Sequence, residues 1–170
     1  MKIVVLMGSP NNNGSTSILV VSFVQGAESA GHTCEIIDVC HANIHPCIGC
    51  VRCGYEGPCV QKDDVETIRW KLLDSDMIVF ASPIYYFTLS AQLQAVIHRT
   101  YSIDIPKNVK KVALIMSSGS AYVYGPAIAQ YYQSIVEYWG VENAGIFTAN
   151  GKQNKSEEKR QELYRFGKSL

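Results

Sequence analysis

The run KIVVLMGSPNNNGSTS at residues 2–17 decides the fold. Residues 2–7 are almost entirely apolar, which is typical of a strand that is covered on both faces. Residues 8–17 are small and polar, and they lead directly into a helical pattern over 15–30 that Gly31 ends. A buried strand, a short polar loop and a helix form the opening unit of a parallel α/β sheet.

The same alternation continues along the chain. Further strands are predicted at residues 33–39, 76–81, 110–116 and 141–148, and further helices after Asp63 or Asp64, over 90–101 and 126–139, and from Ser156. Five strands interleaved with helices predict a five-stranded parallel sheet with right-handed crossovers and helices on both faces. We expect residues 1–170 to form a single domain, with a cysteine-rich loop at 40–62 as its one long irregular stretch.

Composition narrows the class of protein. Hydrophobic residues make up 47% of the chain, which is enough for a core, and fifteen acidic residues balance fifteen basic ones. This charge balance favours neither nucleic acid nor a membrane as a partner. The five apolar residues before Gly8 are too few for a signal-peptide core, and no run approaches a membrane span. We therefore expect a cytoplasmic protein, in which clustered cysteines act as ligands or redox groups rather than as a disulfide scaffold.

The loop at residues 8–17 has the composition of a phosphate site. It runs into a helix N-terminus, where free backbone N–H groups, the helix dipole and several hydroxyls favour an anion. It contains no Lys or Arg, and it matches neither the nucleotide-triphosphate motif nor the classical dinucleotide motif. The same residues are also typical of an ordinary turn with a helix cap.

Two more loops should lie at the same edge, because ligands of parallel sheets bind where the strands end. Residues 81–90 carry two tyrosines and a phenylalanine, which could pack along a flat ring system or simply cover the sheet edge. Residues 117–125 are small enough to let backbone amides approach a ring edge, or to leave the loop flexible. Three suitable loops at one end of a sheet indicate a single ligand site.

Four cysteines fall within PCIGCVRCGYEGPC at residues 46–59, namely Cys47, Cys50, Cys53 and Cys59. Three thiolates at two-residue gaps can bind one metal centre from a single loop, as in bacterial ferredoxins, and the fourth can close the site. Structural zinc usually uses two cysteine pairs set well apart, so the spacing favours a 4Fe–4S cluster over zinc. Metal-free thiols or disulfides are the other alternative.

The remaining thiols and imidazoles suggest no catalytic group. Cys34 lies in a predicted strand and is interpreted as a buried structural thiol, whereas Cys40 has no clear assignment. His98 lies in a predicted helix and is interpreted as structural, while His41 and His45 flank the cysteine loop and could tune it or be exposed. No side chain has the pattern of a general base or nucleophile, so no catalytic residue is predicted.

The segments GSPNNNGSTSIL, PCIGCVRCGYEGPC followed by KDD, and SPIYYFTLSAQLQAVIHR resemble the iron–sulfur flavoproteins and their NAD(P)H-dependent FMN reductase relatives. The resemblance covers the whole chain. It implies a flavodoxin-like three-layer sandwich with strand order 2-1-3-4-5, one FMN per subunit, and a 4Fe–4S cluster on the cysteine loop near a neighbouring subunit's flavin. It also implies a homodimer or homotetramer. Asn11 departs from the family pattern, which often has a basic residue there.

On this interpretation FMN carries the chemistry and the protein holds it. The predicted phosphate ligands are Ser9, Asn11, Ser15, Thr16 and Ser17. The predicted contacts to the ribityl chain and ring are Ser82, Pro83, Ile84 and Tyr85, those at the polar edge of the ring are Ser117, Ser118, Gly119 and Tyr122, and the predicted cluster ligands are Cys47, Cys50, Cys53 and Cys59.

The predicted function is an FMN-dependent oxidoreductase that passes electrons between the cluster, FMN and a small acceptor, with NAD(P)H or ferredoxin as donor. One alternative is an NAD(P)H-dependent FMN or quinone reductase whose cysteines hold no metal. The other alternative is a non-enzymatic electron carrier.

Overall fold

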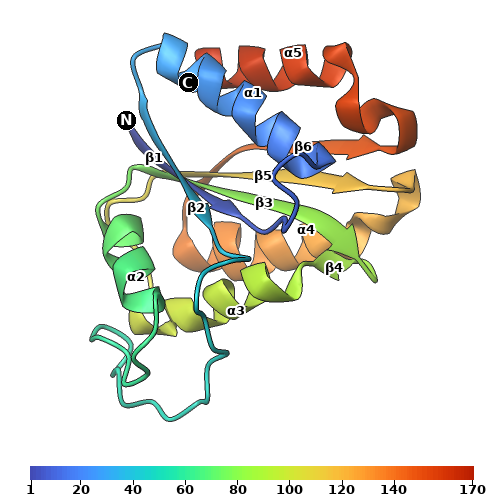
Figure 1. Cartoon of the computed structure of the whole chain (residues 1–170). Helices are drawn as coiled ribbons and strands as arrows, with labels where there is room; N and C mark the ends of the chain where they lie inside the picture. Colours follow the sequence, from blue (N-terminus) through green and yellow to red (C-terminus); the bar gives the residue numbers. More distant parts are fainter.

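A computed structural model describes all residues, 1–170, and contains one central sheet. Its five parallel strands are β1 (Lys2–Met7), β2 (Thr33–Asp38), β3 (Met77–Tyr85), β5 (Lys111–Ser118) and β6 (Glu142–Asn150). Their spatial order is β2-β1-β3-β5-β6, so the predicted order 2-1-3-4-5 of the parallel strands is confirmed (Figure 1). The predicted strand count is wrong by one, because β4 (Thr88–Leu89) pairs antiparallel with the end of β3 and makes the sheet six-stranded.

Helices cover both faces of the sheet, as predicted. Figure 1 shows α1 (Ser15–Ser29) and α5 (Glu157–Lys168) on one face, and α2 (Val65–Leu73), α3 (Ala91–Arg99) and α4 (Gly125–Tyr131) on the other. Short 3-10 segments lie at Thr100–Ser102, Ala121–Val123 and Gly151–Lys155. The helix predicted over 126–139 changes to a π-helix at Tyr132–Glu137. No helix combines the length and the apolar character needed to cross a membrane.

The core has two halves because the strands are buried on both faces. In β1, Val4 and Leu6 belong to the cluster under α2, α3 and α4, whereas Ile3, Val5 and Met7 belong to the cluster under α1 and α5. Successive side chains of a strand point to opposite faces, so an unbroken apolar run fills both clusters. This is the physical reason that the sequence 2–7 identifies the fold.

Two glycines allow the helices of one face to approach closely. A Cβ added at Gly26 of α1 would lie 2.0 Å from the carbonyl oxygen of Tyr164, and one at Gly167 of α5 would lie 2.2 Å from that of Phe23. A larger residue at either position would push against the backbone of the facing helix, which cannot move aside cheaply. Both positions therefore require glycine. Phe23 and Phe166 stack beside this contact with ring centroids 5.4 Å apart.

Candidate flavin and cysteine sites

The start of the loop that follows β1 lies against strand β3 and the start of α3. The N–H of Gly8, the first residue after β1, donates to the carbonyl of Ala81 at 2.7 Å. A Cβ at Gly8 would lie 2.7 Å from Ser90 Oγ and 2.9 Å from Leu93 Cβ, so only glycine lets the first loop pass this close to α3.

A buried pair of hydroxyls joins the first turn of α1, which follows the first loop, to the end of β5, where the third loop begins. Thr16 Oγ1 lies 2.7 Å from Ser117 Oγ, and the two residues are only 1% and 5% exposed. All three predicted loops therefore meet at the carboxyl edge of the sheet.

Asn11 shapes the first loop. Its carbonyl accepts hydrogen bonds from Gly14 N at 2.9 Å and from Ser17 Oγ at 2.7 Å, and its side-chain Oδ1 accepts one from Asn13 N at 3.0 Å. Ser9 Oγ also lies 3.5 Å from the same carbonyl. The side chain of Asn11 is thus used to hold the turn, which gives it a role that a basic residue at this position could not fill.

The N-terminus of α1 is open to an anion. Its N-cap is Gly14, which has no side chain to cap the helix, and the first turn holds no acidic residue. The N–H groups of Ser15, Thr16 and Ser17 donate no hydrogen bond within the protein. Free N–H groups at the positive end of a helix dipole are the donors that a phosphate requires, so these residues fit the phosphate of FMN.

The second loop has a rigid base and an exposed tip. Ser82 is fully buried, and its Oγ accepts from Ser90 N at 2.9 Å while it donates to the carbonyl of Pro83 at 2.6 Å. The β3–β4 hairpin turns through Tyr86 and Phe87, whose φ angles of 47° and 67° are unusual for aromatic residues. Tyr86 is 97% exposed. The hydroxyl of Ser82 therefore fixes the loop, and the aromatic tip is presented to the outside.

The third loop is held by Tyr124 and by Asn154, and Asn154 was not predicted from the sequence as a site residue. The phenol of Tyr124 donates to the carbonyl of Ala149 at 2.6 Å and lies 2.9 Å from Ser118 Oγ. Burial raises the pKa of Tyr124, so the phenol stays protonated and keeps this bond at neutral pH. Asn154 Nδ2 donates to the carbonyl of Ser118 at 2.8 Å, while its Oδ1 is buried without a partner.

Asn154 comes from the 3-10 segment after β6, so a fourth loop reaches this edge of the sheet. An unpartnered buried acceptor beside a predicted ligand site fits a donor on the ligand. No short motif marks such a residue, and its polar neighbourhood in the sequence is typical of any surface turn. Gly119 and Tyr122 lie at the open side of the loop, where a Cβ at Gly119 would meet no atom within 4 Å and Tyr122 is exposed.

The four clustered cysteines are free thiols on an extended loop between β2 and α2. Cys47 and Cys50 are exposed, and Cys53 and Cys59 are half-buried. No three His, Cys, Asp or Glu side chains are grouped to hold a metal ion in this structure. The backbone reaches positive φ at Gly49, Val51, Gly54 and Tyr55, so the chain turns repeatedly within the run. Four thiols on such a loop are a donor set that fits an iron–sulfur cluster, although they are not gathered here.

The two outlying thiols behave as structural groups. Burial, with a smaller contribution from Glu28, raises the pKa of the Cys34 thiol to about 11. Burial and the neighbouring Asp38 raise the pKa of Cys40 to about 11 as well. Because the thiolate is the reactive form, both cysteines carry only a small reactive fraction at neutral pH.

A cavity of about 380 Å³ lies between the second half of α3 and the π-helical segment, and it is lined in part by His98, Tyr101 and Trp139. It is at the opposite end of α3 from the three loops, so it is separate from the predicted flavin site.

The fold and the loops define a flavodoxin-like protein in which the N-terminus of α1 has no side-chain cap. The profile of the NADPH-dependent FMN reductase family matches residues 1–142, and the chain belongs to this family. This confirms the class predicted from the sequence, an FMN-dependent oxidoreductase of flavodoxin-like fold.

Two relatives that are similar in sequence are named iron–sulfur flavoproteins. An iron–sulfur flavoprotein of Archaeoglobus fulgidus is 29% identical over 156 residues, which cover 89% of this chain and 69% of the relative. An iron–sulfur flavoprotein of Methanocaldococcus jannaschii is 35% identical over 105 residues, which cover 62% of this chain and 54% of that protein. The matched part of this chain therefore corresponds to about half of the second relative's length.

Solved structures share the fold. The NAD(P)H:quinone oxidoreductase of Methanothermobacter marburgensis superposes with a TM-score of 0.78 at 18% identity, covering 100% of this chain and 96% of that one. An azoreductase of Bacillus anthracis gives a TM-score of 0.71 at 17% identity, with both chains fully covered.

Proposed function

We propose that this protein is an FMN-dependent oxidoreductase in which electrons pass between a 4Fe–4S cluster on the cysteine loop, FMN and a small acceptor. The observation that carries the flavin part is the meeting of three loops around the uncapped N-terminus of α1, through the Gly8–Ala81 and Thr16–Ser117 contacts. FMN, when bound, supplies one- or two-electron chemistry. The protein supplies binding, orientation and shielding of that group.

The roles of the residues follow from their positions. The backbone N–H groups of Ser15, Thr16 and Ser17 hold the phosphate, and Ser9 and Asn11 shape the loop that presents them. Ser82, Pro83, Ile84 and Tyr85 line the ribityl chain and one side of the ring. Ser117, Ser118, Gly119 and Tyr122 reach the polar edge of the ring, and Asn154 offers its free Oδ1 to a ring N–H.

The cluster part rests on the donor set and on the relatives named iron–sulfur flavoproteins. Cys47, Cys50, Cys53 and Cys59 would supply four thiolates to one cubane. The cysteine loop lies beyond α2 and α3, well away from the β3–β4 hairpin (Figure 1). This separation favours a homodimer or homotetramer in which the loop of one subunit serves the flavin of the next, with the exposed Tyr85, Tyr86 and Tyr122 near the interface.

A second candidate is an NAD(P)H-dependent quinone reductase with metal-free thiols. Two observations favour it, namely that the cysteines are not gathered in this structure and that the solved quinone oxidoreductase has the same fold.

One experiment separates the two. The protein is purified without oxygen, and its absorption spectrum, flavin content and iron content are measured, followed by its reduction with NADPH and with reduced ferredoxin. Bound FMN with about four irons per subunit supports the first proposal. Bound FMN with no iron after anaerobic reconstitution, together with fast NADPH oxidation, supports the quinone reductase.

A further inference from the structure

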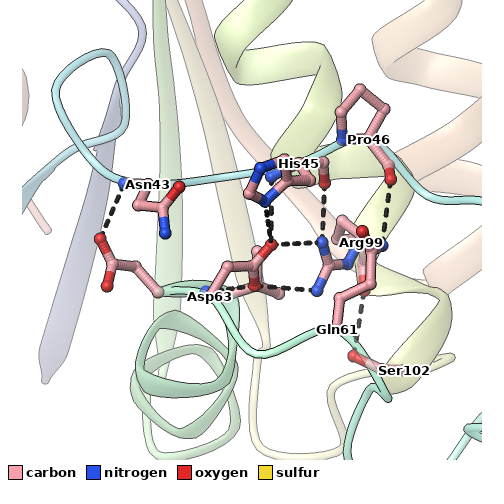
Figure 2. A network of polar contacts seen from close by, with 9 residues as sticks. Asn43, His45, Pro46, Gln61, Asp63, Arg99 and Ser102 are labelled. Carbon is pink, nitrogen blue, oxygen red and sulfur yellow. Dashed lines mark hydrogen bonds and ion pairs between the residues drawn. The ribbon is translucent and has the colours of Figure 1, made fainter.

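A buried ion pair lies at the base of the cysteine loop. Arg99, the last residue of α3, donates from Nη1 to Asp63 Oδ2 at 2.7 Å and from Nη2 to Asp63 Oδ1 at 3.0 Å (Figure 2). The two side chains are 1% and 0% exposed. Such a bidentate pair fixes direction as well as distance, because the planar guanidinium meets both carboxylate oxygens at once.

The same pair reaches the other end of the loop. Arg99 Nη1 also donates to the carbonyl of His45 at 2.7 Å, and His45 N donates to Asp63 Oδ2 at 3.1 Å (Figure 2). Gln61 Nε2 donates to the carbonyl of Pro46 at 3.1 Å and adds a second connection. These bonds join the residues just before Cys47 to the residues just after Cys59, so the mouth of the loop is closed.

Arg99 also lies near one cysteine of the run, Cys59. Its Nε is buried and has no hydrogen-bond partner, and the side chain of Cys59 lies beside the same guanidinium. The 3-10 segment Thr100–Ser102, which follows α3, makes a further contact with the loop, in which Cys53 Sγ lies 3.7 Å from the carbonyl of Tyr101. The two half-buried cysteines are therefore the two that lie near Arg99 and the segment after it, whereas Cys47 and Cys50 are exposed.

The energy of the Arg99–Asp63 ion pair indicates that it serves to fix the position of the loop rather than to stabilise the fold. Burying two charges costs about as much as their attraction returns, so a pair of apolar residues would stabilise the fold equally well. A bidentate ion pair that also binds His45 holds both ends of the loop in a single geometry, which apolar packing does not do.

Helix α3 connects this base to the flavin-binding edge. Ser90 caps α3 by accepting from Leu93 N at 3.4 Å, and it is bonded to Ser82 of the second loop at 2.9 Å. From there to Arg99 the helix spans about 14 Å. The loop mouth is thus fixed to the same rigid element as the ring-binding loop.

We propose that Arg99 is a positioning residue that, with Asp63, holds the mouth of the cysteine loop closed and at a set place on α3, so that its four thiols load one metal centre. The metal-loading part rests on the proposed function. The closed mouth itself requires no metal, so it can be tested separately.

The test uses the full chain with Arg99→Met and Asp63→Asn combined. This variant leaves no buried charge unpaired, and the amide oxygen of an asparagine can still accept from Val65 N, as Asp63 Oδ1 does at 3.2 Å. The matched control is Lys2→Met with Asp74→Asn, which removes an exposed ion pair of 2.9 Å that makes no hydrogen bond to the loop. Trypsin cleavage after the exposed Arg52, which is not next to either substitution in the chain, measures loop opening without metal. Iron per subunit after anaerobic reconstitution and FMN affinity are measured on the same samples.

We expect trypsin to cut the loop of the double variant at least tenfold faster, iron loading to fall at least twofold, and the dissociation constant of FMN to change less than twofold. The control variant should match the wild type in all three. Unchanged cleavage in the double variant would overturn the proposal, as would equal iron loading where the wild type binds iron. If the wild type takes up no iron, the cluster proposal fails and cleavage alone decides the role of Arg99. If the double variant does not fold, Arg99→Lys is used, which keeps the positive charge but loses the bidentate geometry, and unchanged cleavage there overturns the proposal.

Discussion

Thr16 Oγ1 and Ser117 Oγ are hydrogen-bonded at 2.7 Å, although the residues are 101 positions apart in the chain. The contact joins the first turn of α1 to the end of β5, and both hydroxyls are buried. Only one of the two O–H groups is used between them, so the other can donate to a ligand. The two hydroxyls therefore connect α1 to β5, and one of them is a candidate hydrogen-bond donor to the flavin.

We expect Thr16→Val to lower the free energy of unfolding by about 1–3 kcal/mol, because it leaves the hydroxyl of Ser117 buried without a partner. Adding Ser117→Ala should recover part of this loss, since both polar groups are then gone. Urea denaturation of the flavin-free protein measures Thr16→Val, Ser117→Ala and the double variant. Strictly additive losses would show that the two hydroxyls do not interact.

Ser15→Asp tests the phosphate site. The new carboxylate lies in the first turn of α1, where it is favourable to the helix by about 0.3–1 kcal/mol but repels a phosphate at the same N–H groups. FMN binding should weaken by at least about 1.4 kcal/mol, which is tenfold. Riboflavin, which has no phosphate, is the matched ligand control and should bind as it does to the wild type. Equal losses for both flavins in fluorescence titrations would place the phosphate elsewhere.

Cys50→Ser tests the cluster apart from the flavin. If four thiolates hold one cubane, the variant should lose most of its iron and its iron–sulfur absorbance after anaerobic reconstitution. FMN binding should be unchanged, because the cysteine loop makes none of the contacts that join the three flavin loops. Cys34→Ser serves as the control, since Cys34 lies in β2 outside the run. Similar iron content in wild type and Cys50→Ser would exclude this thiol as a ligand.

The cysteines should also differ in how their rate of chemical modification depends on pH. Burial raises the pKa of Cys34 and of Cys40 to about 11, so their thiolate fraction stays small until the pH approaches that value. At pH 8, iodoacetamide should therefore modify the exposed Cys47 and Cys50 first and these two last. Raising the pH toward 11 should speed modification of Cys34 and Cys40, as measured by peptide mass spectrometry. Rapid modification of Cys40 at pH 8 would contradict its structural assignment.

Much of the fold follows from local pattern. The apolar run at 2–7 can be buried on both faces only inside a parallel sheet, and its loop must then emerge at the carboxyl edge beside the loops at 81–90 and 117–125. Helix boundaries were also close, because Ser90 and Ser156 are N-caps whose hydroxyls accept from the first turn. The missed strand β4 has only two residues and exists because Tyr86 and Phe87 turn at positive φ, which their sequence does not suggest.

The sequence by itself determined the alternation of strands and helices, the edge at which the loops meet, and the thiol run, because each depends on residues that are neighbours in the chain. Only the tertiary structure decided which polar groups form hydrogen bonds within the protein. Thr16 pairs with Ser117, Ser82 holds Ser90, Asn154 supports the third loop, and Arg99 closes the cysteine loop. These contacts depend on how the crossover helices pack, and burial makes their partners obligatory, since an unpaired buried polar group costs about 1–3 kcal/mol. No local pattern in the sequence contains that information.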